Sequence, residues 1–342
     1  MRYYAGLDVS VKSTAVCIVD ESGKVVKERF LATEPESLAD WLGKTGLPLE
    51  LVGHEAGGMS AWLQEGLARR GVPVVCIDAR HMATALAAMR NKTDRNDARG
   101  IAQMMRTGWY RETHVKSHAA QELRLLLVAR KSMIDNRRNI ENAIRGTLKV
   151  FGLKVGIVSR LKFSQRVREL VADKPGIADT VGAMLSARDA LMAQYHVLHR
   201  KLKQAAREDK VCRLLMSAPG VGPVVAVTYR AGVDTPERFA KSSCVGAHFG
   251  ITPRRYASGE TDRQGGISKC GDGMVRTALY EAANALLTRS KRASGLKSWG
   301  LAIAKRSSMA KAKVAVARKL AVILHRMWAD GTQFNWGGEA SV

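Results

Sequence analysis

The chain has 342 residues, 46% of them hydrophobic, and a formal net charge of +24, which predicts two or three domains with apolar cores and a polyanionic partner. Nucleic acid is the first candidate and a membrane surface is the rival, but no apolar stretch of transmembrane length and no signal-peptide pattern occurs. The five scattered cysteines form no CxxC pair, which argues against a zinc site or a disulfide framework and favours a reducing, cytoplasmic setting.

The first third of the chain alternates short β-rich stretches with helical ones. The predicted strands are residues 3–9, 14–20, 25–32, 49–56 and 72–78, and the predicted helices are 35–44, 60–71, 79–89 and 93–108. The order βββαβαβα is that of a ribonuclease-H-like domain, although other α/β folds share parts of it. We assign residues 1–115 to this α/β domain.

The middle of the chain, residues 116–210, is predicted to be helical. Residues 119–145 contain no glycine or proline, and a 4-3 spacing of apolar residues runs from 177 to 205, with Arg188 filling a gap. This heptad pattern predicts a coiled coil, either an antiparallel hairpin or a seam with a second subunit. An ordinary helical bundle is the alternative.

The last part, residues 211–342, is predicted to be all-α. The run Pro219-Gly220-Val221-Gly222 between two apolar stretches resembles a helix-hairpin-helix turn, in which Gly220 and Gly222 would let a phosphate approach the backbone. A plain tight turn explains these residues nearly as well. Residues 251–273 are rich in Gly, Ser and Arg, and helices at 274–290 and 311–328 close the chain.

The positive charge is concentrated in the last two thirds of the chain. Residues 1–97 have a net charge of −1, residues 98–220 of +14 and residues 221–342 of +11. The basic segments therefore predict nucleic-acid binding, and the first third has a different task.

Four carboxylates of the first third are expected to meet in one cleft. Asp8 and Glu55 end the first and fourth predicted strands, which lie side by side in a ribonuclease-H-like sheet, and Asp94 and Asp97 share one helix face near those strands. Such a cluster suits two Mg²⁺ ions that hold a phosphodiester. Taken singly, each residue also has an ordinary interpretation as a turn, surface or helix-start residue.

These residues carry a resemblance to a known family. The set Asp8, Glu55, Asp94 and Asp97, within the motifs GLDVS, HEAGG and NKTDRNDA, closely resembles the DEDD transposases of bacterial insertion sequences, the insertion sequence 110 / 1111 family. The resemblance runs nearly the full chain. Stretches similar to that family's C-terminal transposase domain are SAPGVGPVVA, FGITPRRYASGE, SKCGDGMVRTALYEAA and AKAKVAVARKLAVILHRMW. It implies a first domain like the Holliday-junction resolvase RuvC, and a bacterial, nucleoid-associated protein.

The resemblance also implies a second catalytic element, a serine nucleophile in an R-R-Y-x-S-G setting. The matching residues here are Arg254, Arg255, Tyr256, Ser258 and Gly259. Ser258 would attack a DNA phosphate and form a phosphoserine link that conserves the bond energy for rejoining. Arg254 and Arg255 are candidates for phosphate contacts.

The family further implies a structured guide RNA, the bridge RNA, that pairs with donor and target DNA. It also implies a homodimer or homotetramer in which the two catalytic parts meet across subunits. From the residues alone, Ser242, Ser243 and Ser268 remain rival nucleophiles, and Ser258 has an ordinary interpretation as a loop serine.

Three functional hypotheses follow. The first is an RNA-guided, Mg²⁺-dependent DNA recombinase acting through Ser258. The second is a RuvC-like junction endonuclease that uses water and needs no serine. The third is a non-catalytic nucleic-acid-binding scaffold with structural carboxylates.

Overall fold

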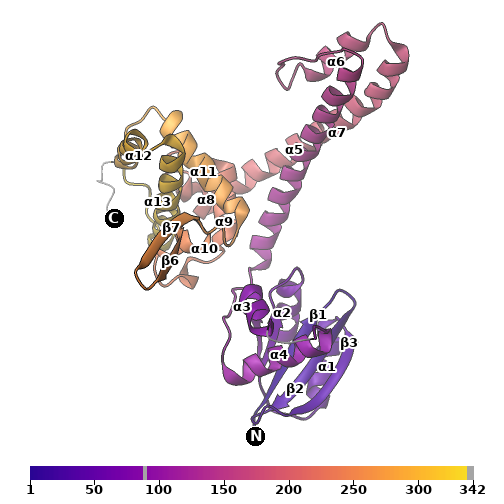
Figure 1. Cartoon of the computed structure of the whole chain (residues 1–342), viewed down its shortest axis with the longest axis vertical. Coiled ribbons are helices and arrows are strands. Elements are labelled where there is room, and N and C mark those ends of the chain that lie inside the picture. The colour runs from indigo at the N-terminus through magenta and orange to yellow at the C-terminus, as the bar shows by residue number, and fades with distance from the viewer. Residues whose placement is uncertain (88–90, 337–342) are drawn as a thin grey trace. The chain divides into compact units, whose positions relative to one another are not determined.

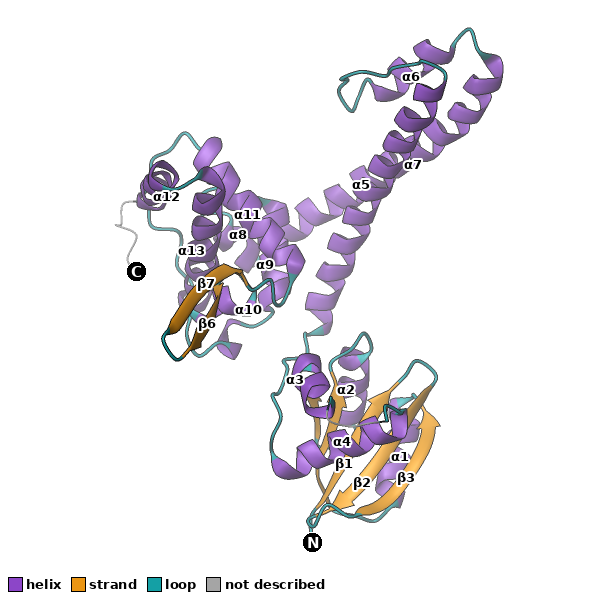
Figure 2. Ribbon diagram, in the orientation of Figure 1, coloured by secondary structure: helices purple, strands orange, loops and turns teal. Residues whose placement is uncertain are grey.

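The computed structural model describes residues 1–87 and 91–336, which form two compact units, Met1–His118 and Ala119–Val342 (Figure 1). The first unit is a mixed α/β structure and the second is mainly helical (Figure 2). The division of the second unit into residues 116–210 and 211–342 stays a prediction. In the described residues, no helix combines the length and the apolar character needed to cross a bilayer.

A five-stranded sheet forms the centre of the first unit. Its strands are β1 (Tyr3–Val9), β2 (Ser13–Asp20), β3 (Val25–Ala32), β4 (Leu49–Glu55) and β5 (Val74–Ile77), in the spatial order β3-β2-β1-β4-β5. Strands β1, β2 and β3 pair with one another in antiparallel fashion, whereas β4 runs parallel to both β1 and β5. The prediction that the first and fourth strands lie side by side is confirmed, and the order is the one expected for a ribonuclease-H-like domain.

Helices cover both faces of this sheet, because alternate residues of the central strands are apolar on both sides. One face packs against α1 (Pro35–Lys44) and α2 (Ser60–Ala68), with Leu7 and Val52 among the buried strand residues. The other face packs against α3 (Ala79–Leu86) and α4 (Asp94–Thr107). The predicted helix 79–89 ends earlier than expected, and residues 88 and 89 lie outside the described residues.

Two glycines opposite one another let α4 lie close to the sheet. Gly6 of β1 and Gly53 of β4 are register partners. A Cβ atom at Gly6 would lie 2.1 Å from the carbonyl oxygen of Ala98, and one at Gly53 would lie 2.6 Å from the sulfur of Met105. Both contacts are with α4, so the missing side chains set the position of this helix.

Two long helices, α5 (His118–Val150) and α7 (Pro175–Glu208), begin the second unit, with the short helix α6 (Phe163–Val171) between them in the sequence. Their apolar cluster includes Ile144, Phe163 and Leu185. The Glu141 carboxylate accepts hydrogen bonds of 3.0 Å from Arg137 of its own helix and from Arg188 of α7. A buried ion network therefore links α5 to α7. The predicted heptad residues are mostly half-buried, and the coiled coil stays a prediction.

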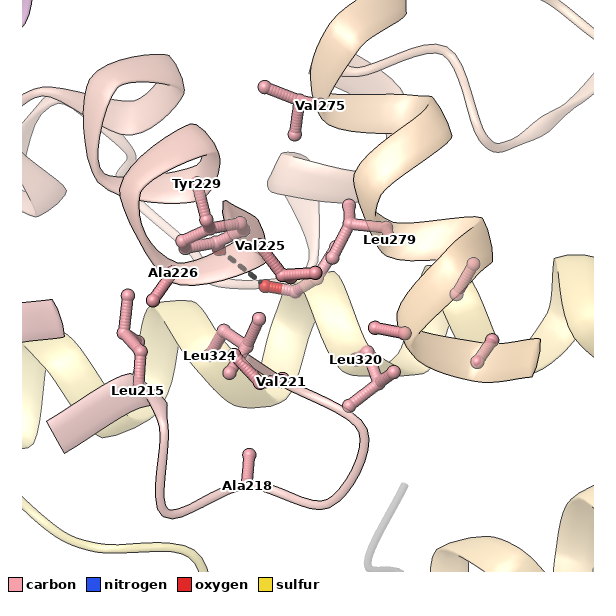
Figure 3. Packing of buried hydrophobic residues seen from close by; sticks show 14 of the residues in the cluster. Leu215, Ala218, Val221, Val225, Ala226, Tyr229, Val275, Leu279, Leu320 and Leu324 are labelled. Carbon is pink, nitrogen blue, oxygen red and sulfur yellow. Dashed lines mark hydrogen bonds between the residues drawn. The ribbon is translucent and has the colours of Figure 1, made fainter. Parts of the chain in front are cut away.

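The remaining elements enclose the largest hydrophobic core. They are α8 (Lys210–Leu215), α9 (Pro223–Val233), a 3₁₀ turn (Pro236–Arg238), α10 (Cys244–His248), β6 (Pro253–Ser258), β7 (Thr261–Ile267), α11 (Gly273–Thr288), α12 (Gly295–Arg306) and α13 (Met309–Asp330). Figure 3 shows Tyr229 of α9 among leucines of α11 and α13. The Tyr229 hydroxyl donates a 2.6 Å hydrogen bond to the carbonyl oxygen of Ala321, so this fully buried ring keeps its polar group satisfied.

The prediction of a wholly helical C-terminal part is wrong in one place. Residues 253–267 form the β6–β7 hairpin, in which Ser258 pairs with Thr261 across a two-residue turn. Nearly every residue of both strands is exposed, so the apolar alternation that normally marks a strand is absent. Helix α12 was also not expected from the sequence.

Candidate active site

The sheet places Asp8 and Glu55 beside each other on the face that α4 covers. Each carboxylate follows its strand's glycine by two residues, and strand residues two apart point to the same face. Because Gly6 and Gly53 are register partners beneath α4, Asp8 and Glu55 lie one step further along the same face. The two strands thus place the carboxylates of Asp8 and Glu55 at the edge of α4.

Helix α4 brings the other two carboxylates to this edge. Thr93 caps the helix, since its hydroxyl oxygen accepts a 3.2 Å hydrogen bond from the backbone N–H of Asn96. Asp94 and Asp97 occupy the first turn. Asp94 is exposed, but Asp97 is only 8% exposed. A merely solvated helix start does not bury a carboxylate, so burial of Asp97 favours the functional interpretation.

The four carboxylates interact electrostatically. The pKa of the Asp8 carboxyl is raised to about 6, first by burial and then by three negative neighbours. Those neighbours are Asp94, Asp97 and Glu55, in decreasing order of effect. Burial also raises the pKa of Glu55, Lys92 lowers it, and Asp97 raises it. The structure therefore brings all four predicted residues into one neighbourhood in which negative charge is under-compensated.

A pocket of about 490 Å³ opens at the ends of β1 and β4. Residues 8–11, residues 54–60 and Leu63 line it. Two of its lining residues, Gly57 and Gly58, have open space where a Cβ would stand, so a ligand can come close to the protein main chain there.

Two side chains that sequence reasoning missed fix the backbone after Glu55. The buried His54 ring nitrogen Nδ1 lies 3.1 Å from the Glu55 carbonyl oxygen, and the Ser60 hydroxyl donates to the same oxygen at 3.2 Å. Burial lowers the pKa of His54, which favours its neutral form. The motifs G-L-D and G-H-E, each a glycine two residues before an acid, were the available signal for the glycine pair, whereas nothing local marks His54 or Ser60.

The donor set fits divalent cations, although the described side chains do not stand as a ready-made ligand cage. No group of three or more His, Cys, Asp or Glu side chains within residues 1–87 and 91–336 has a metal-binding arrangement. Carboxylate oxygens are nevertheless the ligands that Mg²⁺ prefers. A cation would offset both causes that raise the pKa of Asp8, which are its burial and, after it, the neighbouring negative charges.

Ser258 lies elsewhere in the chain, at the tip of the β6–β7 hairpin. It is the last residue of β6, followed by Gly259 with φ of 56°, a left-handed conformation suited to a hairpin turn. The serine is exposed and so accessible to a macromolecular substrate. Ser242 differs from it, because its hydroxyl lies 2.9 Å from Nδ1 of the buried His325.

The other residues predicted to contact nucleic acid are two arginines with hydrogen-bond partners in the chain and two glycines, of which one is closely packed. Arg255 forms two 2.9 Å hydrogen bonds with Asp262, and Arg254 donates a 3.3 Å bond to the carbonyl oxygen of Ser268. A Cβ at Gly220 would lie 2.2 Å from the carbonyl oxygen of Ala282, so this glycine serves close packing against α11. Gly222 has open space around it. The nucleic-acid role of both glycines stays a prediction.

Comparison with known proteins identifies the family. A transposase profile of the IS110 DEDD type matches residues 5–152, which include all four carboxylates. A second profile, described as transposase of the IS116/IS110/IS902 family, matches residues 212–298, which include Ser258. The chain belongs to the IS110 family of DEDD transposases.

Relatives of this transposase match along most of the chain. The transposase for insertion sequence element IS1111A of Coxiella burnetii is 29% identical, over 95% of this chain and 88% of the relative. A probable family 20 transposase of Pseudomonas aeruginosa is 26% identical, over 97% of this chain and 98% of the relative. Among solved structures, RuvC of T. thermophilus in complex with a Holliday junction substrate aligns with 33% of this chain and 100% of its own, with 15% identity and a TM-score of 0.26.

Proposed function

We propose that this insertion-sequence transposase is an RNA-guided, Mg²⁺-dependent DNA recombinase that joins donor and target DNA through a covalent bond to Ser258. The observation that carries the proposal is the convergence of α4's two aspartates on Asp8 and Glu55, which themselves line the pocket at the ends of β1 and β4. Packing alone does not call for four mutually repelling carboxylates at one sheet edge. In this proposal the four carboxylates hold two Mg²⁺ ions.

The chemistry divides between the carboxylates and the serine. Mg²⁺ held by the carboxylates would polarise a phosphodiester and balance charge on the attacking and leaving oxygens. As the Ser258 Oγ–P bond forms, one P–O bond of the DNA strand breaks; the serine hydroxyl gives up its proton and the released deoxyribose oxygen leaves as a hydroxyl. The number of ester bonds is conserved, so rejoining needs no external energy. The exposed hairpin tip supports this role, since it lets the serine reach a duplex.

The distribution of charge supports RNA and DNA as partners. Residues 1–97 carry a net −1, whereas residues 98–220 and 221–342 carry +14 and +11. Basic segments outside the catalytic unit suit phosphate backbones of a guide RNA and of DNA. Delegating sequence recognition to RNA pairing agrees with the absence of an obvious base-reading motif in the sequence.

We further propose a homodimer or homotetramer in which α5 and α7 form part of the subunit contact. The predicted heptad positions support it, because most of them are only half-buried within one chain. Size-exclusion chromatography with light scattering tests the assembly: a monomer at micromolar concentration would contradict it.

A covalent-trapping experiment tests the function. The protein, RNA transcribed from the flanks of its gene, Mg²⁺ and labelled donor and target DNA are incubated and run on a denaturing protein gel. We expect labelled protein with wild type, none with Ser258→Ala or Asp97→Ala, and a wild-type level with Ser242→Ala, the matched serine control.

Other outcomes assign other functions. Cleaved DNA without linked protein, unchanged in Ser258→Ala, would establish the water-using junction endonuclease. DNA binding with no cleavage by any variant would favour the scaffold. Loss of the adduct in Ser242→Ala alone would transfer the nucleophile to the serine beside His325.

A further inference from the structure

The β6–β7 hairpin presents two chemically different faces. In an antiparallel pair, directly opposite residues lie on the same face, and successive pairs alternate between the two faces. Tyr256 is opposite Arg263, and Ser258 is opposite Thr261. One other pair, Ala257 with Asp262, lies between these two pairs. All four side chains therefore lie on one face of the hairpin, which we call the serine face.

The opposite face carries Arg255, and its charge is already neutralised. Arg255 is opposite Gln264, and Asp262 is opposite Ala257, so Arg255 and Asp262 share this second face. Two hydrogen bonds of 2.9 Å join the guanidinium of Arg255 to the carboxylate of Asp262. A phosphate that approached Arg255 would have to displace Asp262 or meet its negative charge.

Arg263, unlike Arg255, has no acidic partner on the hairpin. It is exposed, and in the described part of the chain no hydrogen bond, ion pair or ring contact involves its side chain. It is diagonal to Ser258 across the two strands, a separation that a long side chain can span. Strand alternation also puts Arg254 on the serine face, but Arg254 is four residues from Ser258 and donates to the carbonyl oxygen of Ser268. The guanidinium of Arg263 is thus the positive group of this face that lies nearest to Ser258 in the strand register.

We propose that Arg263 binds the phosphate that Ser258 attacks, and that Arg255 is instead occupied by Asp262 on the other face. The inference rests on the proposed function and names a further residue of that site. A guanidinium offers two parallel N–H donors to the non-bridging oxygens of one phosphate. The same donors oppose the charge that builds up on those oxygens during attack.

The rate of adduct formation tests the assignment. The full-length protein with flank-derived RNA, Mg²⁺ and 5′-labelled donor DNA is sampled over time on a denaturing gel. We expect Arg263→Ala to slow the adduct about 100-fold, as loss of one charge-stabilising donor does, and Arg263→Lys to slow it about 10-fold. Arg255→Ala, the matched arginine on the other face, should slow it less than about 5-fold, because an exposed ion pair contributes little.

A binding measurement separates phosphate contact from a structural effect. The salt dependence of DNA affinity, measured by fluorescence anisotropy without Mg²⁺, should lose about one unit of log–log slope in Arg263→Ala and remain unchanged in Arg255→Ala. A thermal melt of each variant should show wild-type stability for Arg263→Ala, since its side chain lies in solvent.

The outcomes separate this inference from the proposed function. A wild-type adduct rate in Arg263→Ala, with no adduct in Ser258→Ala, would overturn the arginine assignment and keep the recombinase. Equal slowing by Arg255→Ala and Arg263→Ala would also overturn it, since the two faces would then not differ. No adduct with wild type would overturn both.

Discussion

Asp8 is a half-buried carboxylate whose pKa of about 6 lies above its ordinary value. A raised folded-state pKa means that the native protein binds the proton more tightly than the unfolded chain, so Asp8 lowers stability as the pH rises from about 4 through about 6. One pKa unit corresponds to about 1.4 kcal/mol, and solvent screening of this half-exposed group leaves an expected loss of about 1–2 kcal/mol. Urea unfolding of wild type and Asp8→Asn from pH 4 to 8, without Mg²⁺, measures it.

The comparison with the asparagine variant isolates this one group. Asp8→Asn keeps the shape of the side chain and removes its charge, so above pH 6 the variant should be the more stable protein while losing DNA cleavage. A variant that is less stable than wild type at pH 8 would show that Asp8 stabilises the fold, as the scaffold hypothesis requires.

Mg²⁺ should reverse this penalty in the wild-type protein. A cation that binds only the folded state stabilises it by mass action, and it competes with protons for the carboxylates. We expect millimolar Mg²⁺ to raise the melting temperature at pH 7.5 and to have little effect at pH 5. The shift should disappear in Asp8→Asn, and an equal shift in both proteins would place the ion elsewhere.

At the scale of elements, the approach of α4 to β1 decides whether the four acids meet. Gly6→Ala would place a methyl group 2.1 Å from the main-chain oxygen of Ala98, and a main-chain atom cannot move aside as a side chain can. We expect a loss of at least about 3 kcal/mol in unfolding free energy, together with loss of the Mg²⁺ effect.

Two other glycines provide graded controls for this prediction. Gly53→Ala meets the flexible side chain of Met105, so its cost should be smaller. Gly43→Ala, in α1 with no atom within 4 Å, should stabilise by about 0.5–1 kcal/mol through helix propensity. If Gly6→Ala behaved like Gly43→Ala, close packing would not position α4.

The elements that the sequence reveals are those whose apolar period is intact. The five strands and four covering helices of the first unit were predicted in this way, and the acids Asp8 and Glu55 stand at recognisable strand ends. The hairpin β6–β7 could not be predicted in this way, because both of its faces are in solvent and carry polar residues. The strand register, which gives Arg255 and Arg263 different faces, is a three-dimensional fact that no local pattern contains.

Contacts between residues far apart in the sequence account for the other features that could not be predicted from it. Gly220 lies in a motif that fits phosphate binding, yet its Cα packs against the backbone of α11, a segment about sixty residues further along the chain. Arg188 fills a gap in a heptad pattern, and only the structure shows that it pairs with Glu141. Long-range contacts of this kind follow from folding as a whole.

The ion network between α5 and α7 makes Glu141 a sensitive position. Both arginine side chains that it binds, Arg137 and Arg188, are 6% exposed. Glu141→Ala would leave two buried guanidinium groups without their shared carboxylate, and breaking a buried pair costs about 3–5 kcal/mol. Thermal unfolding should show a large drop, whereas Glu169→Ala, which removes an exposed pair with Arg166, should have almost none.

At the scale of the whole molecule, the excess of basic residues and the four clustered carboxylates lie in different stretches of the sequence. The four carboxylates that we propose as catalytic lie within the first 97 residues, whose net charge is −1, while the remaining residues carry the whole positive excess. In the proposed function, a nearly neutral stretch around the acids would limit non-productive attraction of DNA to the proposed metal ligands, and the basic remainder would supply the affinity.

This division predicts that DNA binding and DNA cleavage can be separated. Affinity for non-specific duplex DNA should fall at least about 100-fold between 50 and 200 mM salt, because each neutralised phosphate releases counterions. The double variant Asp8→Asn, Asp97→Asn should bind with the same salt slope and at least wild-type affinity, since it removes only negative charge, yet it should cleave nothing. Anisotropy titrations across salt concentrations, paired with cleavage assays on the same samples, measure both quantities. A parallel loss of affinity and cleavage in the double variant would mean that the carboxylates hold the DNA-binding surface together, and the separation of tasks along the chain would then be wrong.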